Sequence, residues 1–101
     1  MDTEIFQRYA ADIWEQDERE LFINWIAANL LAGNVVPGTG GLRKVGWSRV
    51  GVGKRGGARV VYYNASSEET LWLLIAYTKA KFDNLPSAFL LELKKEVIDH
   101  G

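Results

Sequence analysis

Residues 58–79 read ARVVYYNASSEETLWLLIAYTK, and this stretch decides the fold class. The segment 58–64 is rich in β-branched and aromatic residues, which favour strands. The segment 64–70, NASSEET, is expected to be a turn because it is polar and carries the small residues that turns prefer. The apolar run 71–79 then predicts a second strand, which we expect to be central in its sheet because it is apolar on both faces.

A third strand is expected upstream, at 42–48, where Val45 and Trp47 follow two adjacent basic residues. Alternation places Val45 and Trp47 on the same face as Arg43, and Lys44 on the other face. The Gly-rich basic segment 51–57, GVGKRGG, is expected to connect this strand to the next one as a hairpin loop. The preceding segment 33–41, GNVVPGTGG, reads as a turn-rich connector.

Helices are expected at both ends of the chain. Apolar residues recur at helical spacing over 4–14, and again from Asp17 onward, where Asp17 and Glu20 resemble a capping box and Gly33 is a candidate C-terminal cap. Pro86 starts a helix that runs to about Ile98. The element order predicts a single α+β domain over residues 1–101, a small antiparallel β-sheet packed by two N-terminal helices and a C-terminal helix.

Composition excludes several kinds of chemistry. The 101 residues contain no cysteine, and the only histidine is His100, so disulfides, thiolate metal sites and imidazole catalysis are not expected. No apolar run approaches the roughly 18 residues that a membrane span needs. Gly51, Gly53 and Gly56 match the dinucleotide-binding pattern G-x-G-x-x-G, but a strand rather than a helix follows, so that match is a coincidence.

Charge is unevenly distributed along the chain, although the net charge is only −1. Residues 1–20 carry −5 and residues 68–101 carry −2, whereas residues 21–67 contain six bases and no acid. Such a segment favours a polyanionic partner, with simple solvation of a sheet edge as the plain alternative. The aromatic residues that could stack on bases are Trp47, Tyr62, Tyr63 and Tyr77, and several of these are expected in the core.

The stretch 38–63, GTGGLRKVGWSRVGVGKRGGARVVYY, resembles the signature of the HigB-type branch of the RelE-superfamily toxins. The stretch 72–85, WLLIAYTKAKFDNL, and the C-terminal helix are similar to that family too, so the resemblance covers about Ile5 to Val97. It implies the toxin of a type II toxin–antitoxin pair, a ribosome-dependent endoribonuclease (mRNA interferase) in the cytoplasm. The implied partners are mRNA, the ribosome and a helix-turn-helix, HigA-like antitoxin, with no membrane partner.

The resemblance also implies site residues. The catalytic ones are Arg59, Lys79, Lys44 and Tyr77, and Lys54 and Arg55 match positions suited to RNA binding. Arg43 and Arg49 are added as RNA-binding candidates because they belong to the acid-free basic segment. No metal or cofactor is implied, because the 2′-hydroxyl of RNA can attack the adjacent phosphate in line. Arg59 would hold the phosphate, Lys44 or Lys79 would assist proton transfer, and Tyr77 would orient a base or protonate the leaving oxygen. Which group is the general base stays open.

Three features depart from the family pattern: a shorter N-terminus, Ala80 in place of an asparagine, and Gly46 where many relatives carry arginine. The last leaves one charge fewer in the basic patch, so Gly46→Arg is expected to raise RNA cleavage. Two alternatives stay open. One is a ribosome-independent ribonuclease of the same fold, and the other is a catalytically weak RNA- or ribosome-binding module or antitoxin co-repressor.

Overall fold

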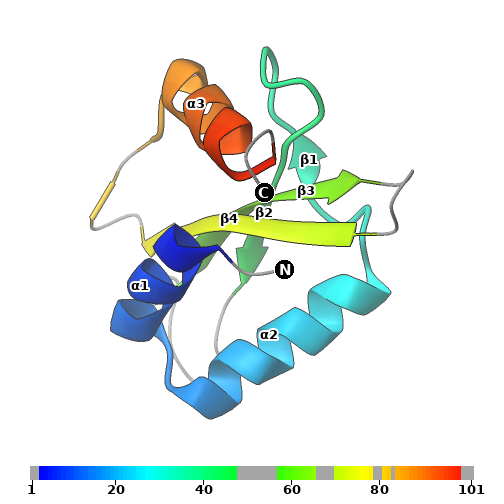
Figure 1. Cartoon of the computed structure of the whole chain (residues 1–101). Coiled ribbons are helices and arrows are strands. Elements are labelled where there is room, and N and C mark those ends of the chain that lie inside the picture. Colours follow the sequence, from blue (N-terminus) through cyan, green and yellow to red (C-terminus); the bar gives the residue numbers. More distant parts are fainter. Residues whose placement is uncertain (1–2, 48–56, 66–69, 79–80, 83, 99–101) are drawn as a thin grey trace.

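The computed structural model describes residues 3–47, 57–65, 70–78, 81–82 and 84–98 of the chain. They form seven elements: α1 (Glu4–Ile13), α2 (Gln16–Ala28), β1 (Asn34–Val35), β2 (Arg43–Trp47), β3 (Ala58–Ala65), β4 (Thr70–Thr78) and α3 (Ser87–Ile98). The strands make one antiparallel sheet in the order β1-β2-β3-β4. Figure 1 shows α3 on one face of this sheet and α1 with α2 on the other. The predicted α+β class, with two N-terminal helices and one C-terminal helix, is confirmed.

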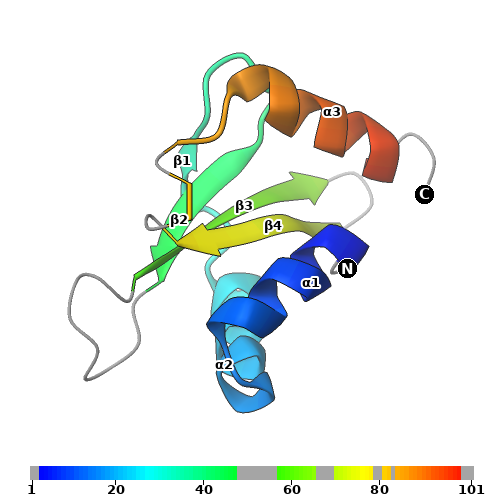
Figure 2. The ribbon, with the colours of Figure 1, turned by 90° about the vertical axis from the view of Figure 1, so that its left-hand side faces the viewer.

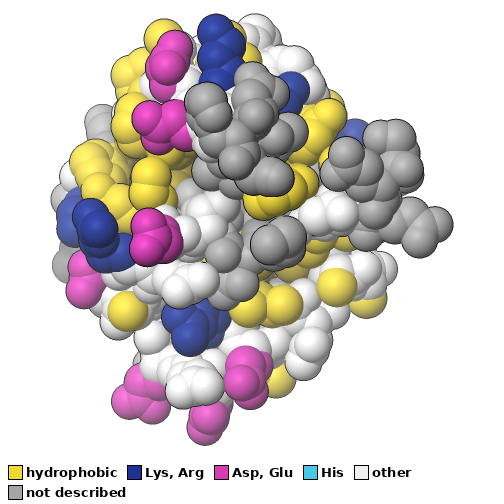
Figure 3. Space-filling model, in the orientation of Figure 1, with side chains coloured by type: hydrophobic (Ala, Val, Ile, Leu, Met, Phe, Trp, Pro, Cys, Tyr) yellow, Lys and Arg dark blue, Asp and Glu magenta, His cyan; other side chains and the backbone are white. Residues whose placement is uncertain are grey.

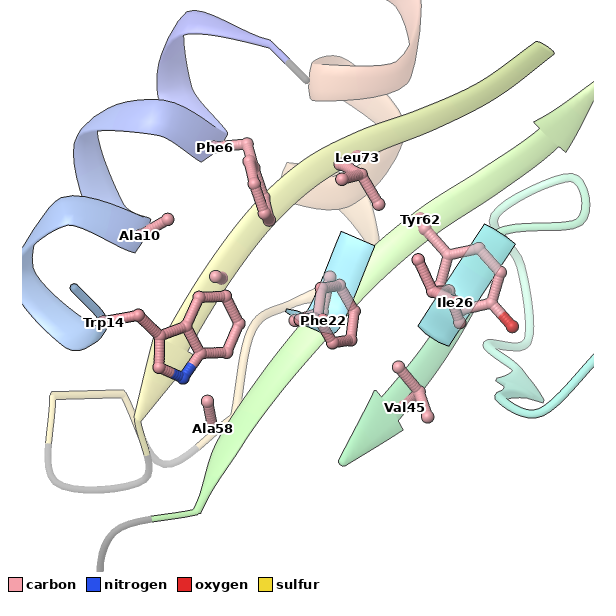
Figure 4. Packing of buried hydrophobic residues seen from close by; sticks show 11 residues of the cluster. Phe6, Ala10, Trp14, Phe22, Ile26, Val45, Ala58, Tyr62 and Leu73 are labelled. Atoms are coloured by element: carbon pink, nitrogen blue, oxygen red, sulfur yellow. The ribbon is translucent and has the colours of Figure 1, made fainter. Parts of the chain in front are cut away.

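The face that α1 and α2 cover holds the larger core. Phe6 and Ala10 of α1 and Phe22 and Ile26 of α2 point toward the sheet, and Trp14, between the helices, stacks on Phe22 with ring centroids 5.3 Å apart (Figure 4). The sheet contributes Val45, Ala58, Val60, Tyr62, Leu73 and Ala76. The helical spacing of these aromatic side chains therefore reflects core packing.

The opposite face of the sheet holds a second core beneath α3. Its buried members are Leu42, Val61, Leu74, Ile75, Tyr77, Leu90 and Leu93. The two cores divide alternate residues of β3 and β4 between them, as strand geometry requires. A β-bulge at Val61/Tyr62 in the β3–β4 pairing interrupts this alternation, so the consecutive residues Leu74 and Ile75 both join the second core.

The expectation that the apolar run 71–79 forms a central strand is wrong, because β4 lies at the edge of the sheet. The N-terminal segment covers that edge. The backbone N–H of Thr3 donates to the Leu73 carbonyl at 3.1 Å, and the Thr3 hydroxyl donates to the Leu74 carbonyl at 3.1 Å. An edge strand shielded in this way, with helices on both faces, can be as apolar as a central one.

Details of the helix ends and of the connector also differ from expectation. α2 begins at Gln16, and its N-cap Glu15 makes no side-chain capping bond, so the capping box at Asp17 is wrong. The helix ends with Asn29, not Gly33, as its C-cap. The turn-rich connector contains the two-residue strand β1, which pairs with Arg43 and Lys44. Within the described residues, no helix has the length and apolar character needed to cross a membrane.

Candidate nucleic-acid interface

Gly46, Arg59 and Tyr77 lie in one row across three adjacent strands. In the registers of the sheet, Gly46 of β2 pairs with Arg59 of β3, and Arg59 pairs with Tyr77 of β4. Residues paired in this way project to the same face of a sheet, here the face of the second core, to which Tyr77 belongs. Lys44 pairs with Val61 on that face, which puts it diagonally across from Arg59, at about 7–8 Å for typical strand geometry.

The helix α3 covers the other end of this face. The ammonium group of Lys94 lies 4.5 Å from the centre of the Tyr63 ring, near the C-terminal end of β3, whereas Arg59 is the second residue of β3. Figure 2 shows α3 above the arrowhead end of β3. The Lys44–Arg59 end of the face is therefore not covered by α3. We call Lys44, Gly46, Arg59 and Tyr77 the open row; the ring of Tyr77 is itself buried.

The two bases of the open row have no acidic partner within the described part of the chain. Neither Arg59 nor Lys44 lies within ion-pair distance of a carboxylate there, whereas Lys81 lies 3.9 Å from Asp12. Both side chains are partly buried. Much of the acidic charge lies elsewhere: α2 packs on the opposite face, and Figure 3 shows acidic side chains over α2 at the lower edge of the molecule. Two cations without an acidic partner among the described residues, on a sheet end that α3 does not cover, favour an anionic ligand.

The guanidinium of Arg59 leans toward β2. A Cβ atom built on Gly46 would lie 3.4 Å from Nη1 of Arg59, so this group occupies the space above the glycine. Gly46 itself is exposed. The planar, permanently charged guanidinium suits bidentate contact with phosphate oxygens.

Tyr77 is the member of the open row on β4, and its side chain is only 3% exposed. Its ring meets Phe82 edge-on, with centroids 6.2 Å apart, and Phe82 meets Tyr9 of α1 in the same way at 6.0 Å. Burial raises the pKa of Tyr77 above its ordinary value of 10.0, and the positive charge of Arg59 opposes part of that rise. At neutral pH Tyr77 is therefore an uncharged phenol, which can donate a proton but cannot act as a base.

Arg43, expected from the sequence to bind RNA, lies on the opposite face from the open row. Its Nη1 donates to the Gly33 carbonyl at 2.7 Å. The N–H of Gly33 donates to the Tyr62 hydroxyl at 2.9 Å, and that hydroxyl donates to the Leu30 carbonyl at 2.8 Å. Arg43 thus belongs to a hydrogen-bond network that holds the connector after α2 against the sheet.

The structure brings together three of the four expected catalytic residues: Lys44, Arg59 and Tyr77. The fourth, Lys79, lies outside the described residues, as do Arg49, Lys54 and Arg55. In the described ranges there is no group of three or more histidine, cysteine or acidic side chains that could hold a metal ion.

The aromatic residues considered for base stacking are mostly used in packing. Tyr62 is fully buried, and Trp47 packs on Phe22 and Trp25 at the opposite face. Sequence reasoning missed Phe82 as the neighbour of Tyr77. In the sequence, Phe82 is only an aromatic residue that follows the strand by a few positions. Its contact with Tyr77 depends on the turn in which the Phe82 N–H donates to the Thr78 carbonyl, and the sequence pattern did not reveal that turn.

The fold and the open row together define a small α+β domain with a basic, partly uncovered sheet face. No family model matches this chain.

Proposed function

We propose that this chain is an endoribonuclease that cleaves mRNA on the translating ribosome, the toxin of a type II toxin–antitoxin pair. The observation that carries the proposal is Arg59, a cation without an acidic partner among the described residues, set between Gly46 and the neutral phenol of Tyr77. The resemblance of residues 38–63 and 72–85 to HigB-type toxins supports the same function. The proposed partners are mRNA, the ribosome and a helix-turn-helix, HigA-like antitoxin in the cytoplasm.

The proposed reaction needs neither a metal nor a histidine. The 2′-hydroxyl oxygen of RNA bonds to the adjacent phosphorus, and the bond from phosphorus to the 5′-oxygen breaks, leaving a 2′,3′-cyclic phosphate. Arg59 would stabilise the negative charge that grows on the phosphate oxygens. Tyr77 would give its proton to the leaving 5′-oxygen and regain one from water. The proton of the 2′-hydroxyl would leave to solvent or to a neutral lysine amine, for which Lys44 and Lys79 are the candidates.

One observation favours the alternative of a catalytically weak RNA- or ribosome-binding module or antitoxin co-repressor. Tyr77 is only 3% exposed, so a leaving oxygen could reach its hydroxyl only by a close approach along the open row. Arg59 and Lys44 would bind phosphates without any such approach. Binding and cleavage therefore have to be measured separately.

The experiment is a reconstituted translation system programmed with one mRNA, with new 5′ ends mapped after addition of the protein. New ends that appear only with ribosomes present support the proposal. Equal cleavage of the same RNA without ribosomes indicates a ribosome-independent ribonuclease. Stalled translation with no new 5′ ends indicates the binding module and contradicts the proposed enzyme.

A further inference from the structure

Gly46 stands in a regular strand without any backbone reason to be glycine. The described glycines that need a positive φ are Gly38, Gly40 and Gly41, all in the connector before β2. The pairing of β2 with β3 runs through Gly46 in continuous register, and the bulge of the sheet lies elsewhere, at Val61/Tyr62. A glycine in a strand interior weakens the strand, and it often marks a place where another group approaches closely.

The group that approaches is the guanidinium of Arg59, whose Nη1 lies 3.4 Å from the position that a Cβ would take. On its other side Arg59 has Tyr77, a large ring that is almost completely buried and held by Phe82. Toward β2 the guanidinium therefore meets no side chain at position 46, whereas toward β4 the Tyr77 ring takes up the neighbouring position. The missing side chain of Gly46 leaves room on the β2 side for the guanidinium.

We propose that Gly46 is the positioning residue of the open row: by lacking a side chain it lets the Arg59 guanidinium lie over β2 with its outer face open to a phosphate. This inference rests on the proposed function, since it assigns the phosphate to RNA. A methyl group at position 46 stands in ordinary contact with Nη1. A branched side chain adds atoms beyond that contact and moves the guanidinium away from β2.

The same geometry bears on Gly46→Arg. From the sequence, that substitution was expected to add a charge to the patch. In the structure the new side chain would start in contact with Nη1 of Arg59 and would bring a second guanidinium beside the first. The two like charges repel each other, so we expect displacement of Arg59 to offset the added charge.

The test is a double-mutant cycle with Gly46→Val and Arg59→Ala, read out as affinity for a single-stranded RNA oligonucleotide. A hydrogen bond from a charged group is worth about tenfold or more in an equilibrium constant, so Gly46→Val is expected to weaken binding about tenfold, with Gly46→Ala between valine and wild type. In the Arg59→Ala background, Gly46→Val is expected to cause no further loss. The control is Asn64→Val, which places the same branched side chain at the far end of β3 and should leave affinity unchanged.

A second readout does not depend on RNA. The side-chain N–H signal of Arg59 in ¹⁵N NMR, assigned by its loss in Arg59→Lys, is expected to shift strongly in Gly46→Val and little in Asn64→Val. Equal losses of affinity from Gly46→Val in both backgrounds, or an unmoved Arg59 signal, overturn the inference while leaving RNA binding intact. If the wild type binds no RNA, the proposed function fails, and the Arg59 signal alone decides whether Gly46 positions this side chain.

Discussion

Arg59 and Tyr77 are register partners on neighbouring strands, and the charge of Arg59 lowers the pKa that burial raises in Tyr77. Burial is the larger effect, so the phenol stays protonated through the neutral range. The pair thus offers a permanent cation and a proton donor at adjacent positions of one sheet face. In the proposed cleavage, the cation would stabilise the charge that grows on the phosphate oxygens, and the phenol would protonate the leaving 5′-oxygen.

Replacing Tyr77 by phenylalanine tests its role as the acid. We expect cleavage to fall about 100-fold to 10,000-fold, the usual contribution of general acid–base catalysis, with RNA affinity unchanged because Arg59 remains. Cleavage rate and affinity are measured on the same RNA. A rate close to that of the wild type contradicts the role of proton donor.

Stability at high pH checks the pKa of Tyr77 independently of function. The folded-state pKa lies above the ordinary value of 10.0, so the unfolded chain loses this proton first as the pH rises. The contribution of Tyr77 to stability is fully present below pH 10 and is lost as pH rises through the folded-state pKa. Urea unfolding on both sides of pH 10 should show a steeper loss for the wild type than for Tyr77→Phe. Arg59→Ala should raise the pKa of Tyr77 further, as seen in an NMR titration of its ring.

Replacing Arg43 by methionine should affect stability rather than RNA binding. The substitution removes the bond to the Gly33 carbonyl, and hydrogen bonds from charged groups contribute about 1.5–3 kcal/mol. The free energy of unfolding should fall by an amount of that order. The salt dependence of RNA affinity should stay the same, and a flatter salt dependence would instead favour the RNA-binding role expected from the sequence.

The expected role of the basic loop 51–57 in RNA binding is tested by measuring how RNA affinity depends on salt concentration. If Lys54 and Arg55 contact RNA phosphates, their joint replacement by alanine should reduce the slope of log affinity against log salt by about 1–2. The titration uses one RNA oligonucleotide over a range of salt concentrations. An unchanged slope removes this pair of residues from the interface.

Much of the fold follows from local sequence patterns. The β-branched and aromatic residues of 58–64 predicted β3, alternation placed Lys44 and Arg43 on opposite faces, and Pro86 marked the start of α3. The edge position of β4 was missed because it depends on Thr3, some 70 residues away in the sequence, which bonds to that edge. β1 was missed because a two-residue strand has no periodicity to detect.

The candidate site was predictable only in part, for a related reason. Strand alternation and hairpin pairing were enough to bring Lys44, Arg59 and Tyr77 to one face. The contact between Arg59 and Gly46 depends on the direction in which a long side chain leans, which no sequence pattern encodes. The role of Arg43 was missed because its partner is a backbone carbonyl, and any residue type can supply one.

The most direct test of the central claim is the cleavage of mRNA by Arg59→Ala in the reconstituted translation system. A partly exposed strand charge without an acidic partner contributes little to folding, so the variant should unfold within about 1 kcal/mol of the wild type. We predict that new 5′ ends disappear with Arg59→Ala and return in part with Arg59→Lys, since an ammonium group cannot reproduce the bidentate contact. Undiminished cleavage by a stably folded Arg59→Ala protein would contradict the account.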